Sequence, residues 1–392
     1  MYDSLYLLKT GELALKGGNK SDFVKILNRN LVTMLKTSGA QTNNTDGRIY
    51  VHCMQESETY VEDVLNHLCG ITGWAKAHKA EKSIDAVLCA VTEEAKRSFL
   101  AGFRTFKIEA RRTDKSFPLT SYQLCAQAGE AVINSLPGFT VDVHNPQITF
   151  FVEIREKAYI YGTQNKGLRG LPVGTAGRGL LLLSGGIDSP VAGFLIALRG
   201  MKINAVYFHA YPYTSDDARL KVVKIAEILG RYSMGIKLNT VSFTDVQIKI
   251  KEAAPEEWRT ILLRMAMMEA ASIIASQQKC KCLITGESLS QVASQTIENI
   301  ACTESRVNYP VLRPLIGLDK ESITKISEKI GTYKTSILPY QDCCVLFSPP
   351  HPILHGNKNT AKEIYESLQL QDIIYDACKN RTTEKCGFWE QV

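Results

Sequence analysis

The residues best suited to chemistry form the segment Ser184-Gly185-Gly186-Ile187-Asp188-Ser189. The two glycines let the backbone turn tightly and bring its N–H groups close to a ligand. Ser184 and Ser189 offer hydroxyl donors, and the carboxylate of Asp188 can hold a magnesium ion. The segment therefore predicts a site for a phosphate-bearing ligand.

An apolar run, Leu180 to Leu183, precedes this segment, and a helix-forming sequence follows it. Ser189 at the N-cap and Pro190 in the first turn are both favoured at the start of a helix, and a helix N-terminus attracts anions. The segment is not a Walker loop, because the G-x-x-x-x-G-K-[ST] spacing is missing. The alternative is a Gly-Gly turn without any anion site, which the order of strand, loop and capped helix disfavours.

Eleven cysteines offer a second kind of chemistry. They lack the regular spacing of a disulfide scaffold, so we expect most of them to be reduced and buried. No C-x-x-C occurs, and we interpret Cys280-Lys-Cys282 as a packing feature. The adjacent pair Cys343-Cys344 is open to two interpretations: two thiols that point in opposite directions, or a reactive pair.

Basic and aromatic residues are concentrated between residues 96 and 117. The bases are Lys96, Arg97, Arg104, Lys107, Arg111, Arg112 and Lys115, and the aromatic residues are Phe99, Phe103, Phe106 and Phe117. Such a basic strip is the footprint expected for a phosphate backbone. A solvated helix face followed by a strand with buried phenylalanines would give the same composition.

The chain has 392 residues, a formal net charge of +6 and 45% hydrophobic residues. This length exceeds one hydrophobic core and predicts two or three domains, and the composition excludes disordered and fibrous proteins. The richest apolar stretch, Ile261 to Ala275, is interrupted by Arg264 and Glu269, so we expect no membrane span. No secretory signal pattern opens the sequence, and the cytoplasm is the expected compartment.

Short helices and strands mix in the first 165 residues, which favours one or two small α+β domains. Apolar spacing predicts helices over 22–37, 83–99 and 121–135, and strands over 47–53, 105–110, 148–154 and 158–163. Residues 162–179 are rich in glycine and lack an apolar period, which is typical of a linker.

After the linker, strands and helices alternate regularly. Strands are predicted at 180–183, 203–208, 236–242, 282–285 and 311–316, and helices at 189–199, 216–229, 256–278 and 289–299. This alternation predicts an α/β fold with a doubly wound parallel sheet. Ligands of such sheets bind beyond the carboxyl ends of the strands, in the loops after residues 183, 208, 242 and 285.

The Ser184–Ser189 segment resembles the pyrophosphate loop of the ATP pyrophosphatase (PP-loop) superfamily, whose members transfer AMP to a substrate oxygen and release pyrophosphate. Five further segments, in the expected order over nearly the whole chain, resemble the tRNA 4-thiouridine synthetase (tRNA sulfurtransferase) family. They are GELALKGGNK at 11–20, FKIEARRTDKSFPLTS at 106–121, TGESLSQVASQT at 285–296, RPLIGLDK at 313–320 and YQDCC at 340–344.

The resemblance implies three domains and a linker. A ferredoxin-like domain is expected over 1–60 and a THUMP RNA-binding domain over 61–165. A linker over 166–178 leads to a PP-loop domain over 179–392, with a fold like that of adenine nucleotide alpha-hydrolases. No rhodanese domain is expected after Val392.

The resemblance also implies the nucleotide site. Arg264 is expected to serve as a nucleotide or transition-state cation, although it could equally extend from a Met-rich helix towards solvent. The family pattern has glycine where this chain has Ser290. The residues implied to bind ATP are Leu182, Leu183, Ser184, Gly185, Gly186, Ser189, Phe208, Arg264, Gly286 and Gln295.

In the family, the basic strip falls in the THUMP domain and is expected to bind tRNA phosphates. The tRNA-binding residues so implied are Lys107, Arg111, Arg112 and Lys115, whereas the interleaved phenylalanines are expected in the THUMP core.

The implied enzyme uses ATP and Mg²⁺ to adenylate uridine 8 of tRNA and then replaces O4 with persulfide sulfur, giving 4-thiouridine. Asp188, as a magnesium ligand, and Cys343, as the sulfur-handling residue, are the implied catalytic residues. The neighbouring Asp342 argues against a lowered pKa of the Cys343 thiol. A cysteine desulfurase is the expected persulfide donor, and the family leaves a homodimer and a role in thiamine thiazole synthesis open.

Two rival functions are a 2-thiolating or amidating synthetase of the same superfamily and a non-catalytic tRNA-binding protein. The first would lack the THUMP-like front half, and the second would show a damaged phosphate loop or no Cys343.

Overall fold

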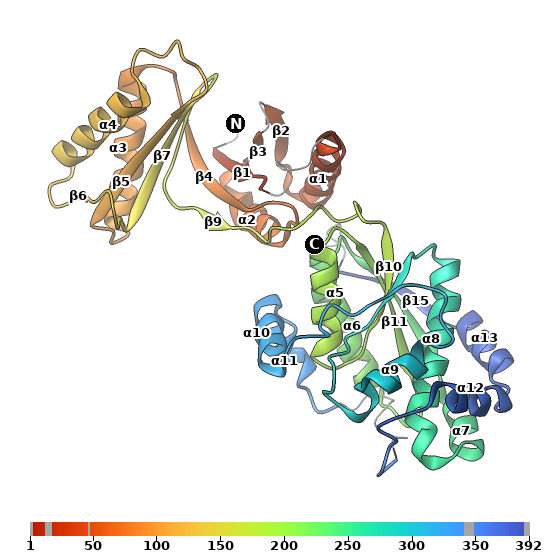
Figure 1. Cartoon of the computed structure of the whole chain (residues 1–392). Coiled ribbons are helices and arrows are strands. Elements are labelled where there is room, and N and C mark those ends of the chain that lie inside the picture. Colours follow the sequence, from red (N-terminus) through yellow and green to blue (C-terminus); the bar gives the residue numbers. More distant parts are fainter. Residues whose placement is uncertain (1–2, 12–17, 46–47, 341–348, 388–392) are drawn as a thin grey trace. The chain divides into compact units, whose positions relative to one another are not determined.

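The computed structural model describes residues 3–11, 18–45, 48–340 and 349–387. The chain divides into two compact units, Met1–Gly170 and Leu171–Val392 (Figure 1). Each unit has its own sheet and its own core. Within the described ranges, no helix has the length and apolar character needed to cross a membrane.

The first unit is built on one continuous sheet whose main strand order is β2-β3-β1-β4-β8-β7-β5-β6. β4 joins its two halves, because Gly73–Ala77 pairs with β1 and His78–Ala80 pairs with β8. The strands are β1 (Ser4–Lys9), β2 (Gln41–Thr45), β3 (Arg48–Cys53), β4 (Gly73–Ala80), β5 (Thr105–Arg112), β6 (Thr140–Val141), β7 (Ile148–Ile154), β8 (Ala158–Tyr161) and β9 (Asn165–Lys166), which pairs with β4.

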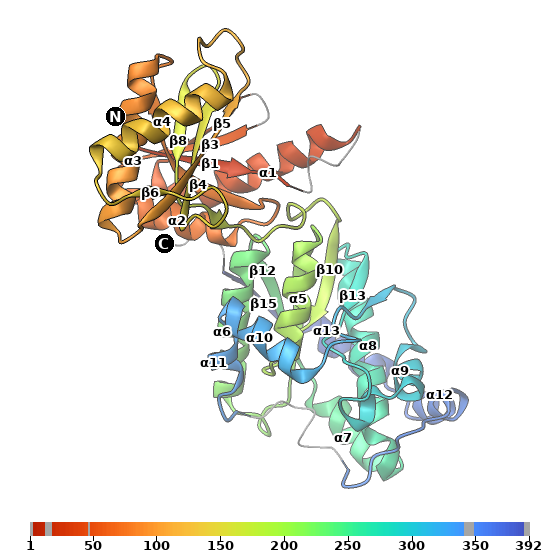
Figure 2. The same cartoon turned by 60° about the vertical axis from the view of Figure 1, so that its left-hand side comes forward.

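The α-helices of the described part of this unit are α1 (Lys20–Met34), α2 (Glu58–His67), α3 (Ile84–Leu100) and α4 (Ser121–Ser135). α4 starts at a capping box, in which the Thr120 hydroxyl accepts from Gln123 N and the Gln123 side chain accepts from Thr120 N. α3 and α4 pack on the β5–β7 half of the sheet over a core that includes Phe106, Phe139 and Phe150 (Figure 2).

The second unit has a six-stranded sheet in the order β14-β13-β10-β11-β12-β15. Five strands are parallel, whereas β15 pairs antiparallel with β12, so the predicted parallel sheet has an antiparallel edge. The order reverses between β10 and β13, as in a doubly wound fold. The strands are β10 (Arg178–Leu182), β11 (Lys202–His209), β12 (Ile236–Ser242), β13 (Cys282–Ile284), β14 (Val311–Leu312) and β15 (Thr382–Cys386).

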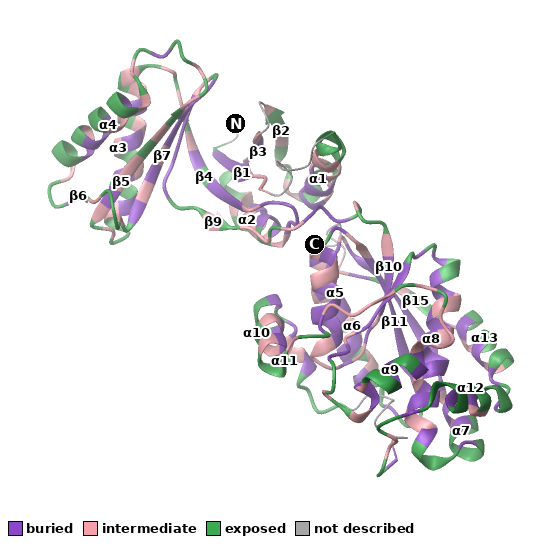
Figure 3. Ribbon diagram, viewed as in Figure 1, coloured by how far each residue is buried: buried purple, intermediate pink, exposed green. Residues whose placement is uncertain are grey.

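Helices cover both faces of this sheet (Figures 1 and 2). One face carries α5 (Asp188–Leu198), α6 (Asp216–Tyr232), α10 (Lys320–Ile330) and α11 (Tyr333–Ser336). The other carries α7 (Thr244–Ala253), α8 (Arg259–Gln277), α9 (Ile297–Glu304), α12 (Lys358–Ser367) and α13 (Gln371–Lys379). α8 is apolar on nearly every side because four of these helices and the sheet surround it, and Figure 3 shows it mostly buried.

Two predicted elements differ from the structure. The helix predicted over 289–299 is wrong in position: a 3-10 turn occupies Ala293–Gln295, and α9 begins at Ile297, where the Thr296 hydroxyl accepts from Asn299 N. The strand predicted over 311–316 has only two residues, because residues 313–316 form a turn in which Ile316 N donates to Arg313 O.

The glycine-rich connection between the units makes backbone hydrogen bonds at both of its ends. Gly167 N donates to Thr72 O in the first unit, and Gly174 N donates to Gly200 O in the second. The division of the chain falls at Gly170, and the finer domain boundaries stay predictions.

A buried polar network fixes the register of the second sheet. The side-chain oxygen of Asn239, which is fully buried, accepts from Gln278 Nε2 at 2.6 Å, from Arg381 Nε at 3.1 Å and from Thr383 Oγ1 at 3.1 Å. These donors belong to the end of α8 and to the start of β15. Because buried donors are costly when unpaired, this one amide specifies how three elements meet.

Asn239→Ala should destabilise the second unit by about 3 kcal/mol, since it leaves the buried Gln278 Nε2 without its acceptor and removes the hydrogen bonds from Arg381 and Thr383. Hydrogen exchange of peptides from β11 and β12 would show the loss as faster exchange of their amides. Asn359→Ala, at an exposed position of α12, is the matched control and should change stability by less than about 0.5 kcal/mol. Equal protection in both variants would contradict the role of the network.

Candidate active site

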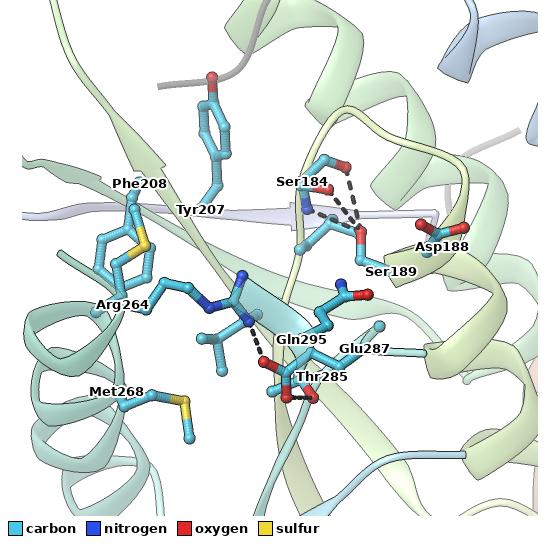
Figure 4. A pocket seen from close by; sticks show the side chains of 14 residues that line it. Ser184, Asp188, Ser189, Tyr207, Phe208, Arg264, Met268, Thr285, Glu287 and Gln295 are labelled. Atoms are coloured by element: carbon cyan, nitrogen blue, oxygen red, sulfur yellow. Dashed lines mark hydrogen bonds and ion pairs between the residues drawn. The ribbon is translucent and has the colours of Figure 1, made fainter. Parts of the chain in front are cut away.

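The candidate site is a pocket at the carboxyl ends of β10, β11 and β13, bordered by α8 (Figure 4). It lies beside the switch point between β10 and β13, where doubly wound sheets bind ligands. The lining residues are Leu182, Leu183, Ser184, Asp188, Ser189, Tyr207, Phe208, Arg264, Met267, Met268, Thr285, Gly286, Glu287 and Gln295.

The structure brings most of the predicted nucleotide residues together here. Eight of the ten predicted residues line the pocket: Leu182, Leu183, Ser184, Ser189, Phe208, Arg264, Gly286 and Gln295. The remaining two, Gly185 and Gly186, lie in the loop beside it, and Asp188 also lines the pocket. Sequence reasoning missed five lining residues, Tyr207, Met267, Met268, Thr285 and Glu287.

The loop after β10 is closed by hydrogen bonds between its two serines. The Ser189 hydroxyl accepts from Ser184 N at 2.9 Å and lies 3.1 Å from Ser184 Oγ, which in turn accepts from Gly186 N at 3.2 Å. The predicted N-cap role of Ser189 is therefore wrong. α5 begins at Asp188 with Ile187 as its N-cap, so Ser189 lies inside the first turn and its hydroxyl points back to the loop.

Gly286 lies against the first turn of α5. A Cβ atom at this position would approach Ser189 N to 2.7 Å and Ser189 Cα to 2.8 Å, which no side chain tolerates. Four residues later, Ser290 adopts a φ of +60°, a backbone conformation that favours glycine. The glycine that the resemblance led us to expect here would adopt this conformation without strain.

The Asp188 carboxylate has two partners that the sequence did not indicate. Lys320 Nζ lies 2.6 Å from Asp188 Oδ1, and Gln291 Nε2 donates to Oδ2 at 2.9 Å. The described residues contain no cluster of three or more His, Cys, Asp or Glu side chains, so a magnesium ion at Asp188 would take its other oxygen ligands from water and a bound molecule. Lys320 and Gln291 belong to the RPLIGLDK and TGESLSQVASQT segments, but the resemblance that these segments carry did not mark either residue as a partner of Asp188.

A buried carboxylate organises the floor of the pocket. Glu287 contacts Arg264 Nη2, accepts from Arg313 Nε at 2.6 Å and accepts from Thr285 Oγ1 at 2.9 Å. Burial alone would raise the pKa of Glu287, but the charges of Arg264 and Arg313 outweigh it and lower that pKa below its ordinary value. Arg264 lines the pocket and contacts Glu287, and its role as a nucleotide or transition-state cation stays a prediction.

Two polar atoms in the pocket wall have no hydrogen-bond partner among the described residues. They are Arg264 Nε, a donor, and Gln295 Oε1, an acceptor, and both are buried. Buried polar atoms are almost always paired in folded proteins, so each is expected to meet a bound ligand or water. Apolar side chains, including Phe208 and Met268, line the pocket beside them (Figure 4).

Cys343 lies outside the described residues, as do Asp342 and Cys344. The described chain just before it is anchored by Lys221, a side chain that is only 7% exposed. Its ammonium donates to the carbonyl of Leu338 at 2.8 Å and to that of Tyr340 at 3.3 Å.

None of the nine described cysteines lines the pocket. Seven are buried, including Cys280 and Cys282, and burial raises the pKa of each of these two thiols to about 11. Their burial agrees with the packing interpretation of this pair.

The predicted tRNA-binding residues lie on β5 and in the turn after it, where their environments differ. Arg111 and Lys115 are exposed, Lys107 pairs with Glu109 at 2.8 Å, and Arg112 donates to Phe117 O at 3.1 Å. The four phenylalanines of the strip belong to the α3–α4 core or pack against it, as expected.

Fold and site together define a PP-loop α/β domain that follows an α+β unit. Three family descriptions match in order: the ThiI ferredoxin-like domain at residues 5–75, the THUMP domain at 81–162, and "Thiamine biosynthesis protein (ThiI)" at 174–370. The chain belongs to the ThiI family of tRNA sulfurtransferases and is a sulfurtransferase enzyme.

Curated relatives over nearly the full length carry this activity in their names. A probable tRNA sulfurtransferase of Treponema pallidum is 46% identical over 96% of this chain and 94% of its own, and one of Caldanaerobacter subterraneus is 44% identical over 94% and 96%. A crystal structure of a 4-thiouridine synthetase–RNA complex with bound ATP matches with a TM-score of 0.91, 33% identity, and 98% and 99% coverage of the two chains.

Proposed function

We propose that this enzyme uses ATP to adenylate O4 of uridine 8 in tRNA and then replaces that oxygen with sulfur to give 4-thiouridine. The observation that carries the proposal is the pocket, where a phosphate loop, a cation and unpaired polar atoms converge. The similar 4-thiouridine synthetase, solved with RNA and ATP, supports it.

Different parts of the pocket suit the adenine and the phosphates of ATP. Leu182, Phe208 and Met268 offer an apolar surface for adenine, and the unpaired Gln295 Oε1 can accept from an N–H or O–H group of the nucleoside. The loop N–H groups and the start of α5 suit the β- and γ-phosphates, which then leave as pyrophosphate.

Asp188 fits a magnesium ion that shares its coordination with these phosphates. When bound, the ion would neutralise charge on the leaving pyrophosphate. Lys320 and Gln291 hold the Asp188 carboxylate in place and add a further positive charge at the edge of the loop.

Sulfur transfer requires a thiol that can reach the adenylated base. In the proposed step, the terminal sulfur of a Cys343 persulfide attacks C4, and AMP leaves with the original O4. Cleavage of the S–S bond, by a second thiol that forms a disulfide with Cys343, then leaves sulfur on the base. A cysteine desulfurase would load the persulfide, and a thiol reductant would restore Cys343. The lack of any described cysteine in the pocket wall supports this assignment.

The THUMP-containing unit is proposed to bind tRNA through phosphate contacts. Arg111 and Lys115 are the best placed, because they are exposed, whereas Arg112 already donates to a backbone carbonyl and Lys107 is paired. A role in thiamine thiazole synthesis, a homodimer and a cytoplasmic location stay predictions.

The most direct test combines pure enzyme, ATP, magnesium, unmodified tRNA and a sulfide source, and follows AMP and the near-ultraviolet absorbance of 4-thiouridine.

Asp188→Asn should lower tRNA-dependent AMP release by at least about 10²-fold, because it removes the charge that holds both magnesium and Lys320. The affinity for tRNA should change by less than about twofold. Asp217→Asn, in the exposed first turn of α6, serves as the control. AMP release at the wild-type rate would refute the role of Asp188.

Cys343→Ser should still form adenylated tRNA but no 4-thiouridine, since the hydroxyl cannot carry sulfur. Mass spectrometry of the tRNA would separate the two products. Cys89→Ser, at an exposed position of α3, should thiolate normally. Unimpaired thiolation by Cys343→Ser would assign the sulfur step to another thiol.

Replacing Arg111 and Lys115 with glutamine should weaken tRNA binding and reduce the slope of log K against log salt by about 1.5, as expected for two lost phosphate contacts. Lys25→Gln on α1, whose ammonium is 3.8 Å from Asp22, is the control. A slope that equals the wild-type value would place the RNA footprint elsewhere.

A further inference from the structure

The buried carboxylate of Glu287 has no evident task in binding a nucleotide. It is 3% exposed, lines the pocket and carries a negative charge where the phosphates of ATP are expected. An anion at that place repels phosphate unless cations outweigh it. Its function must therefore be sought in the groups it contacts.

Those contacts divide between the two carboxylate oxygens. Oε2 accepts from Thr285 Oγ1 and Arg313 Nε, which fix the carboxylate relative to β13 and to the turn after β14. Oε1 contacts Nη2 of Arg264, which reaches the pocket from α8. The contacts of Oε2 thus fix the carboxylate in place, and Oε1 holds one cation, Arg264.

Arg264 lies between the apolar part of the pocket and the phosphate loop. Figure 4 shows its guanidinium between Phe208 and Met268 on one side and Ser184, Ser189 and Asp188 on the other. Adenine beside the apolar residues and pyrophosphate in the loop would place the α-phosphate near Arg264. Its buried Nε has no partner among the described residues, so a donor remains for a ligand oxygen.

We propose that Glu287 is a positioning residue that holds the Arg264 guanidinium toward the α-phosphate of ATP, an inference that rests on the proposed nucleotide site. Arg313 and Thr285 keep Glu287 in place, and Glu287 keeps one edge of Arg264 occupied, so that its other donors face the reacting phosphorus. Negative charge builds on the α-phosphate oxygens as uridine O4 attacks and pyrophosphate leaves.

Glu287→Gln keeps the size of the side chain but removes the charge that orients Arg264. Full-length enzyme with magnesium and saturating ATP and tRNA should release AMP about 10²-fold more slowly, as expected when a catalytic group is misplaced by about 1 Å. The Kd of ATP should rise by less than about fivefold, because the loop and the apolar surface still bind the nucleotide.

A double-mutant cycle with Arg264 separates positioning from general stability. If Glu287 acts through Arg264, the variant that carries Arg264→Gln and Glu287→Gln should release AMP at the rate of Arg264→Gln alone, within about twofold. Losses that multiply in the double variant would overturn the proposal.

Glu304→Gln is the matched control, since Glu304 contacts Arg313 but not Arg264 in the described structure. It should leave AMP release within about twofold of wild type. Glu287→Asp is the second variant, for use if Glu287→Gln fails to fold. Aspartate keeps the negative charge that Arg313 requires, but its shorter side chain no longer reaches Arg264. AMP release should therefore fall in this variant too.

Wild-type rates in a folded Glu287→Gln or Glu287→Asp variant would overturn the positioning role. The proposed function would fail differently, because the wild-type enzyme itself would then show neither ATP binding nor tRNA-dependent AMP release. The two failures are therefore distinguishable in one set of measurements.

Discussion

The approach of Gly286 to the first turn of α5 is the constraint on which the pocket depends. It brings the chain after β13 within van der Waals distance of Ser189, so that Thr285 and Glu287 share one cavity with the phosphate loop. A Cβ atom at Gly286 would collide with backbone rather than with a movable side chain. The separation of the two strand ends is thus set by main-chain packing.

The ion pairs in and beside the pocket differ in how far they are buried. Asp188 and Lys320 lie at the edge, where the lysine is half exposed, while Glu287 and its two arginines form the buried floor. Exposed pairs are weak and can exchange partners with an arriving phosphate, whereas a buried pair is costly to break. The pair at the edge is therefore suited to binding and releasing a ligand, and the buried group is suited to holding Arg264 in a fixed orientation.

The sequence predicted most of the sheet of the second unit, because short apolar strands followed by Gly-rich or capped turns are local signals. The family resemblance added residues that line the pocket, such as Gly286 and Gln295. Nothing in the sequence indicated β15, whose Thr-Thr-Glu-Lys-Cys sequence is too polar to mark a strand. The partners of Asp188 were equally hidden, since Lys320 is 132 residues away and meets it only in the folded chain. Pairings of this kind arise from tertiary structure, and local patterns carry no information about them.

The environment of the other cysteines bears on how sulfur could be handled safely. A persulfide transfers its sulfur readily to a thiolate, and only the ionised thiol attacks. Cys53, Cys69, Cys378 and Cys386 are buried, and burial raises the pKa of each thiol, which disfavours the thiolate. In the proposed persulfide route, burial of these four thiols keeps them from competing with the base for the sulfur.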